Sequence, residues 1–215
     1  AGRERVIDRL YALTGGDPLL VGLDVVELAG RGDDAAQLRP EELDDIEPGY
    51  EGYFDRWWKE QKKLWAAQGQ DDPLLQETLT RSLLRVLSVA LGPLSFDDVA
   101  ALLQQAGQSP HPYELWDAFE PLRRFVIGDG EEQGFTFTHP RLGDYFRESA
   151  RFFNKRLLAE QRAAYAGWAR QAAADRRAAG EKGAALSPYL LQYGVRHLAL
   201  AAAPPETYIE VALSG

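Results

Sequence analysis

Residues 112–137 of the chain read PYELWDAFEPLRRFVIGDGEEQGFTF. The first part predicts a helix, because its apolar residues recur at the i, i+1, i+4, i+7 spacing of one helix face: Leu115, Trp116, Phe119 and Leu122. The second part predicts a β-hairpin. Residues 124–127 have extended character, Gly-Asp-Gly at 128–130 favours a turn, and Phe135 and Phe137 alternate as in a strand.

Two more helices are expected upstream of this stretch. One begins at Asp72-Pro73 and ends at Gly92-Pro93. The other opens at Ser95, with Asp98 three residues later as an approximate capping box. Three helices followed by one hairpin is the element order of a winged helix, so we expect a winged-helix domain over residues 71–150.

The flanking segments also have helical patterns. Residues 1–70 predict a helical segment that contains an acidic, linker-like stretch at 33–55 and an aromatic helix carrying Tyr50, Phe54, Trp57, Trp58 and Trp65. We interpret these rings as a core stripe, with a base-stacking platform or a partner-docking face as alternatives. Residues 151–215 predict an antiparallel helical hairpin or array. The expected fold class is therefore mainly α.

Charge bears on the DNA-binding role that a winged helix suggests. The chain has 33 acidic and 24 basic residues in 215, a formal net charge of −9. A helix that enters a DNA groove needs cations and base-reading side chains, but the exposed face expected here carries Glu114, Asp117 and Glu120. The hairpin turn adds Asp129, Glu131 and Glu132. A winged-helix nucleic-acid regulator stays an alternative, but we expect the helix to serve packing and nucleic acid not to be a partner.

The sequence offers little for catalysis or membrane insertion. It contains no phosphate-binding loop, no dinucleotide fingerprint, no nucleophile elbow and no zinc-protease helix. With no Cys and three His, we expect no metal site and no catalytic residue. No apolar run reaches the roughly 18 residues that span a bilayer. Because the chain has no Met and starts at Ala1 without a signal peptide, we expect a cytoplasmic piece of a longer protein.

Four short motifs, in their order along residues 3–200, resemble the STAND-class signal-transduction ATPases, which include apoptotic ATPases, NB-ARC resistance proteins and NACHT proteins. Residues 14–20 (TGGDPLL) resemble the Gly-x-Pro motif that opens the lid helices of the family. Residues 92–100 (GPLSFDDVA) and 135–146 (FTFTHPRLGDYF) are similar to phrases that open and close its winged helix. Residues 193–198 (YGVRHL) resemble the helical segment that leads to sensor repeats.

The resemblance implies a role without catalysis in the chain itself. The nucleotide-binding core that takes ATP or ADP would lie upstream and the sensor repeats downstream, both as intramolecular partners, with homo-oligomers forming on activation. No cofactor is expected on the isolated chain. Pro18 matches the motif proline that packs on the adenine, and His139 matches the histidine of the Met-His-Asp motif that contacts the diphosphate. Thr138 and Pro140 replace the flanking Met and Asp, and the matching acid could at most be Asp144.

Simpler interpretations stand beside these roles. Pro18 fits the first turn of a helix without any ligand, and His139 can merely cap the helix that follows it. His197 lies in an apolar helix, which favours a buried core histidine, and His111 is expected in an exposed loop. A helical protein-interaction adaptor with no link to nucleotide is the remaining alternative for the whole chain.

Overall fold

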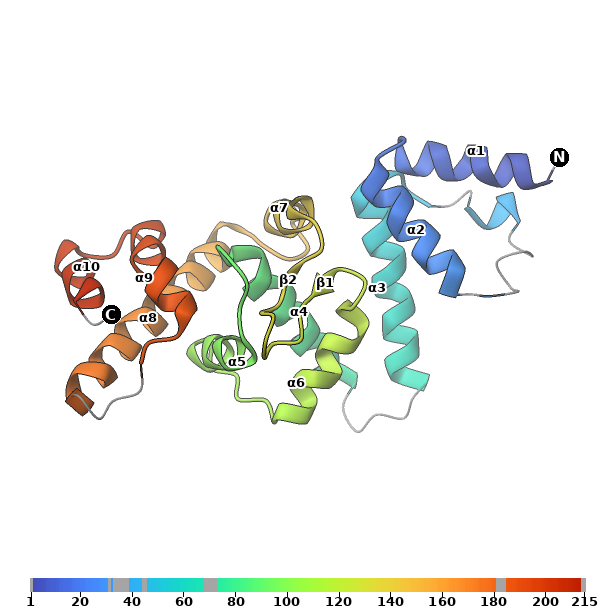
Figure 1. Ribbon diagram of the computed structural model, residues 1–215. Helices are drawn as coiled ribbons and strands as arrows, with labels where there is room; N and C mark the ends of the chain where they lie inside the picture. Colours follow the sequence, from blue (N-terminus) through green and yellow to red (C-terminus); the bar gives the residue numbers. More distant parts are fainter. Residues whose placement is uncertain are drawn as a thin grey trace. The chain divides into compact units, whose positions relative to one another are not determined.

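The computed structural model describes residues 2–30, 32, 39–43, 46–67, 73–180 and 185–213 (Figure 1). Within these residues the chain forms ten α-helices and one two-stranded antiparallel sheet. The expected fold class, mainly α with one β-hairpin, is confirmed. The chain divides into two compact units, residues 1–75 and residues 76–215.

The first unit is helical throughout its described part. Its elements are α1 (Gly2–Thr14), α2 (Pro18–Gly30), a short 3-10 helix η2 (Pro40–Leu43), α3 (Gly49–Ala67) and the start of α4 (Pro73–Val89). Four of the five predicted stripe residues are buried, as the core interpretation predicts: Phe54, Trp57, Trp58 and Trp65 are at most 8% exposed, whereas Tyr50 is half-buried. Neighbouring rings meet edge to face, with 88° between the Phe54 and Trp57 planes and 82° between Trp58 and Trp65.

The predicted linker-like stretch at 33–55 is partly described. Residues 33–38 and 44–45 lie outside the described residues, whereas 40–43 form η2 and 49–55 belong to α3. The helix begins inside the acidic stretch, at Gly49, whose φ of +82° is a left-handed conformation that glycine adopts readily. From there the aromatic stripe is buried against the rest of the unit, so packing outweighs the acidic composition.

The second unit begins with the elements of the predicted winged helix. They are α4, α5 (Phe96–Gln105), α6 (Pro112–Phe119) with a 3-10 turn η3 (Glu120–Leu122), β1 (Val126–Ile127), β2 (Thr136–Phe137) and α7 (Pro140–Glu148). The expected capping box is present: Ser95 Oγ accepts from the Asp98 N–H at 3.1 Å, and Asp98 Oδ2 accepts from the Ser95 N–H at 3.0 Å. Their shared core includes the fully buried Leu83, Leu94, Leu102, Leu115, Phe125 and Phe146.

The hairpin is short, and three backbone pairings hold it. Val126 pairs with Phe137 and Ile127 with Thr136, and an isolated bridge joins Leu94 to Phe135. The turn depends on Gly128, whose φ is +104° and where an added Cβ would lie 2.3 Å from the Gly134 carbonyl oxygen. The hairpin therefore combines tight backbone contact with a conformation that other residues rarely adopt.

One residue of the predicted α6 face is placed differently. Leu115 and Phe119 are buried, but Trp116 is 40% exposed and stacks on Phe96 at a centroid distance of 4.8 Å. Trp116 therefore lies at the edge of the predicted apolar face, where its ring also contacts Phe119 and Phe135. An indole can cover a neighbouring ring while its outer edge stays in water, so the apolar pattern overestimates burial here.

The last three helices pack onto the helices of the predicted winged helix instead of forming a separate unit. They are α8 (Lys155–Ala179), α9 (Pro188–Leu200) and α10 (Pro205–Ala212). From residue 76 onward the predicted segments 71–150 and 151–215 share one unit, and α8 packs against α5 as well as α9. The buried Tyr165 of α8 also donates a 2.9 Å hydrogen bond to the Val86 carbonyl of α4.

Candidate functional site

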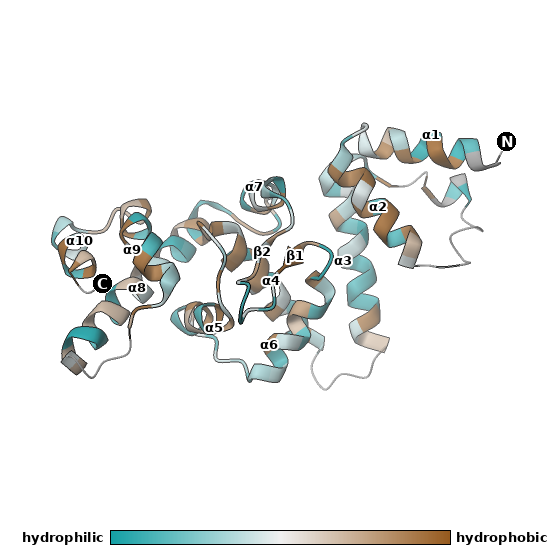
Figure 2. Cartoon of the chain, viewed as in Figure 1, coloured by the Kyte–Doolittle hydropathy of each residue, from teal (hydrophilic) through white to brown (hydrophobic). Residues whose placement is uncertain are grey.

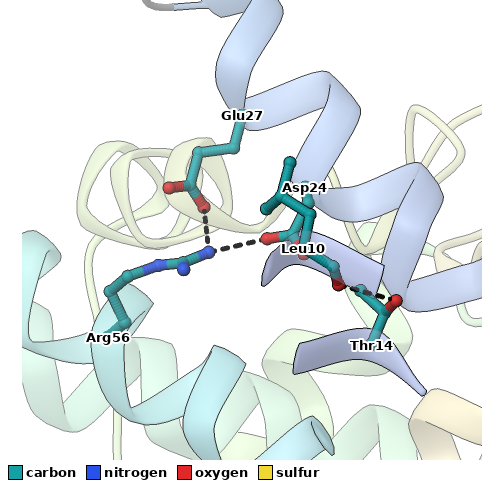
Figure 3. Close-up of polar contacts among 5 residues, drawn as sticks. All are labelled: Leu10, Thr14, Asp24, Glu27 and Arg56. Carbon is teal, nitrogen blue, oxygen red and sulfur yellow. Dashed lines mark hydrogen bonds and ion pairs between the residues drawn. The ribbon is translucent and has the colours of Figure 1, made fainter. Parts of the chain in front are cut away.

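The Gly-x-Pro motif forms the corner between α1 and α2. Thr14 Oγ1 donates to the Leu10 carbonyl at 2.9 Å and so closes α1 (Figure 3). Gly15 and Gly16 turn the chain with φ of +58° and +72°. Asp17 then caps α2, because its Oδ1 accepts from the Leu19 N–H at 2.9 Å. Pro18 is the first residue of α2 and is exposed. A proline in the first turn of a helix needs no ligand to explain this position.

Helix α2 leaves one apolar face exposed. Figure 2 shows how hydrophobic this helix is for a surface element. Leu20 and Leu23 are buried, whereas Val21, Val25 and Val26 are 40%, 58% and 56% exposed. Three exposed branched residues within two turns make a continuous apolar strip, and this strip begins at Pro18.

A cluster of charged residues fixes the other side of α2, as Figure 3 shows. Arg56 Nη2 of α3 lies 2.7 Å from Asp24 Oδ1 and 3.4 Å from Glu27 Oε2. Burial raises the pKa of Asp24 above its ordinary value, although the hydrogen bond and the charge of Arg56 oppose it. Burial lowers the pKa of Arg56, but Glu27 and Asp24 outweigh it, and the net pKa is raised. The sequence did not predict this cluster; the available signal was two acidic residues, Asp24 and Glu27, within a helix that is otherwise apolar.

His139 begins α7 and caps it. Its Nδ1 accepts from the Arg141 N–H at 3.2 Å, and the side chain is exposed. Because Nδ1 is an acceptor, the proton of the neutral ring is assigned to Nε2. The simpler interpretation, that His139 caps the helix, therefore holds geometrically, and Nε2 stays available as a donor.

Asp144, the candidate acid of the motif, lies one turn further along α7. It forms an ion pair with Arg147, whose Nη1 also donates to the Ser88 carbonyl at 2.6 Å. Asp144 is exposed, so this pair contributes little to stability. Its visible role is to orient Arg147, which ties α7 to α4.

The other two histidines have structural positions. His111 is exposed, as expected, and caps α6: its Nδ1 faces the Tyr113 N–H at 3.4 Å, and its own N–H donates to Glu114 at 2.6 Å. His197 is 1% exposed, which confirms that it is a core histidine, but its Nδ1 has no hydrogen-bond partner among the described residues. Its Nε2 lies 2.7 Å from the Tyr189 hydroxyl, and its ring stacks on Tyr165 at 4.1 Å.

Burial of His197 predicts a stability that falls in acid. Burial, with a smaller contribution from Arg196, lowers the pKa of His197 to about 4 from its ordinary 6.5. A depressed histidine pKa means that the unfolded chain binds the proton more tightly, so stability is full above pH 6.5 and is lost as the pH falls toward 4. The shift corresponds to about 3 kcal/mol.

Denaturant unfolding at pH 7.5, 6 and 5 measures this effect. His197→Asn should show a smaller loss of unfolding free energy between pH 7.5 and 5 than the unchanged chain does. His111→Asn is the control, since its ring is exposed, and should keep the full pH dependence. Parallel pH profiles for all three proteins would contradict the assignment.

The surface that a winged helix presents to DNA is acidic here. Glu114, Asp117 and Glu120 lie on α6 and η3, and Asp129 is exposed in the hairpin turn. Backbone N–H groups of Gln133 and Glu131 lower the pKa of Asp129 below its ordinary value, which keeps it charged. We expect no shift of duplex DNA in a gel at about 50 mM salt. A shift that disappears on raising the salt would contradict this expectation.

The structure places the two candidate nucleotide contacts in different units. Pro18 belongs to residues 1–75 and His139 to residues 76–215. Across the described ranges, no cluster of three or more His, Cys, Asp or Glu side chains could hold a metal ion. Among the helices in those ranges, none combines the length and the apolar character needed to cross a membrane.

Comparison of the chain with protein-family models, curated proteins and solved structures found no match.

Proposed function

We propose that the chain is the regulatory middle region of a STAND-type, nucleotide-dependent signalling switch, and that it is not an enzyme by itself. In this proposal an upstream core binds ATP or ADP, and repeats downstream sense the signal. Exchange of the nucleotide changes how the winged helix packs on the core. Other nucleotide switches work in this way, through rotation of a domain or ordering of a segment.

The exposed face of α2 carries the proposal. Val21, Val25 and Val26 stay accessible, although the opposite side of the helix is anchored by Arg56. Such a strip favours a packing partner beyond the described residues of this unit. The motif resemblance suggests the nucleotide-binding core as that partner, and in this proposal Pro18 stands at the end of the strip nearest the nucleotide.

His139 supports the same proposal from the second unit. Nε2 is free to donate to a phosphate oxygen while Nδ1 holds the helix start. The first backbone N–H groups of α7 add a positive partial charge at that point, which favours an anion. A diphosphate held in this way would keep the winged helix against the core in the resting state.

The strip on α2 can be tested by association in trans. The nucleotide-binding core encoded upstream is produced separately and titrated with the 215-residue chain by calorimetry. Val25→Asp is expected to weaken association about tenfold, because it places a charge in an apolar contact. Val195→Asp, at a valine that is 41% exposed on α9, is the matched control and should bind normally.

Two results would contradict the proposal. One is a gene without a Walker A lysine loop upstream of residue 1. The other is equal binding of the core by the Val25→Asp and Val195→Asp variants.

An adaptor role is a second candidate, favoured by the surface of the last two helices. Leu191 and Val195 of α9 and Ile209 of α10 are 56%, 41% and 63% exposed. These side chains form an exposed apolar surface on which another protein could pack. The upstream sequence separates the two candidates, because an adaptor needs no phosphate-binding loop.

A further inference from the structure

Helix α6 presents an aromatic face to solvent. Four exposed side chains follow the i, i+3, i+4, i+7 spacing and therefore share one side of α6 and η3: Tyr113, Trp116, Asp117 and Glu120. Tyr113 is 75% exposed and Trp116 is 40% exposed. Tyrosine and tryptophan at a protein surface are the residues that most often dominate the energy of a binding interface. The face therefore favours a partner.

Neighbouring rings hold these two aromatic side chains in place. Trp116 stacks on Phe96 of α5, with 4.8 Å between the ring centroids and 22° between the planes, and it meets Phe135 edge to face. The Tyr113 ring stacks on His111 at a centroid distance of 5.1 Å. A ring that its neighbours already hold loses little side-chain freedom when a partner binds, so the face is preorganised.

The turn between β1 and β2 lies beside the same rings, where Figure 1 shows the hairpin close to α5 and α6. The Phe96 N–H donates to the Gly130 carbonyl at 2.8 Å. A Cβ on Gly130 would lie 2.5 Å from the Phe135 ring, so only glycine lets the turn come this close. The turn residues that follow Gly130 therefore border the stack of Trp116 on Phe96.

Carboxylates surround the rings. Four exposed ones are neighbours in sequence of Phe96, Trp116 or Gly130: Asp97, Asp117, Glu131 and Glu132. Within the described residues none of these four forms an ion pair, and Arg123, the nearest cation along the chain from Asp117, is paired with Glu120 at 2.7 Å. The negative charge around the rings is therefore uncompensated, which favours a cationic partner and opposes an anionic one.

An arginine side chain matches both features of this surface. Its planar guanidinium stacks on an aromatic ring, while its N–H groups bind carboxylates. The ammonium group of lysine is more strongly hydrated and has no planar face. We propose that the aromatic face of α6, which consists of Tyr113, Trp116 and the surrounding carboxylates, binds an arginine-rich segment of another protein. This role goes beyond the nucleotide switch proposed above and does not depend on it.

Calorimetric titration of the 215-residue chain with short peptides tests the proposal at about 50 mM salt. Hexa-arginine should bind with a Kd of about 100 μM or tighter. Hexalysine has the same charge and should bind about fivefold more weakly, because it lacks the stacking group. Hexaglutamate should not bind. Absence of hexa-arginine binding, or equal binding of hexalysine, would overturn the proposal.

Aromatic variants then locate the site. Trp116→Ala removes the central ring without a change of charge and should weaken hexa-arginine binding about fivefold. Tyr11→Ala is the control, since Tyr11 is a 67% exposed ring on α1, outside this face, and should bind normally. Equal affinity of the two variants would contradict the assignment.

Charge variants decide the matter if Trp116→Ala does not fold. Asp117→Asn/Glu131→Gln and Asp8→Asn/Glu206→Gln each remove two exposed negative charges, but the second pair lies on α1 and α10. The first double variant should weaken hexa-arginine binding about fivefold and the second less than about twofold. Equal weakening would mean that the overall charge attracts the peptide, and would overturn the proposal.

Sedimentation of the free chain examines the alternative occupant, a second copy. We expect a monomer for the unchanged chain. A dimer that Trp116→Ala dissociates would show that a second copy covers the face, and would also overturn the proposal.

Discussion

Replacing Arg56 with methionine is expected to lower the free energy of unfolding of the first unit by about 3 kcal/mol. Arg56 Nη2 lies 2.7 Å from Asp24 Oδ1, and Asp24 is only 7% exposed. Without the guanidinium, a buried carboxylate loses both its hydrogen bond and its countercharge. Methionine keeps most of the stem, so the change acts mainly on charge.

The loss should depend on pH. Burial already raises the pKa of Asp24 in the folded chain, and removal of Arg56 should raise this pKa further. An acid with a raised folded pKa destabilises the fold at high pH and ceases to do so when it is protonated. The deficit of Arg56→Met should therefore be largest near neutral pH and shrink as the pH falls through the folded pKa of Asp24.

Hydrogen exchange of α2 and α3 measures this effect within the first unit, and tryptophan fluorescence supports it because Trp57, Trp58 and Trp65 all lie in α3. Lys59→Met is the matched control, since it breaks an exposed pair with Asp55 and should cost less than about 0.5 kcal/mol. Arg56→Met/Asp24→Leu should recover most of the loss. An unchanged exchange rate in Arg56→Met, or no recovery in the double variant, would contradict the role of this pair.

Local patterns were sufficient to predict much of the second unit. The spacing of Ser95 and Asp98 predicts the capping box, and the glycines at 128 and 130 with Phe135 and Phe137 predict the hairpin, because these features depend on residues close in sequence. Trp116 shows the limit of such patterns, since periodicity does not distinguish a buried ring from one that covers a neighbour.

Long-range contacts were not predictable in the same way. Asp24 and Arg56 are 32 residues apart in sequence. Arg85 donates a hydrogen bond to the carbonyl of Phe152, which is 67 residues away in sequence. A pocket beside α8 exists because alanines and a glycine of this helix have small side chains. In a sequence, alanines predict only a helix and a glycine only a flexible position. Which face of α8 meets α5 is set by packing in three dimensions, and a single sequence contains no direct signal for it.

In the full-length protein that the proposed switch implies, His139→Ala is expected to speed the release of ADP roughly thirtyfold. One hydrogen bond from Nε2 to a phosphate oxygen contributes about 2 kcal/mol, which corresponds to that factor. Loss of the Nδ1 cap at Arg141 also weakens the start of α7. Because bound diphosphate maintains the resting state in this proposal, basal signalling should rise.

A matched variant separates the two effects of this substitution. His139→Asn keeps a cap for α7, because asparagine accepts from backbone N–H groups at a helix start, but its shorter side chain does not place a donor where Nε2 lies. We expect His139→Asn to release ADP almost as fast as His139→Ala. His111→Ala is the control for loss of an exposed histidine cap and should release ADP at the normal rate.

The rate of ADP release from the full-length protein, followed with a fluorescent diphosphate in His139→Ala and in the unchanged protein, tests the central claim most directly. The proposed switch predicts release that is roughly thirtyfold faster in the variant, with higher basal signalling. Equal release rates and equal signalling in the two proteins would contradict it.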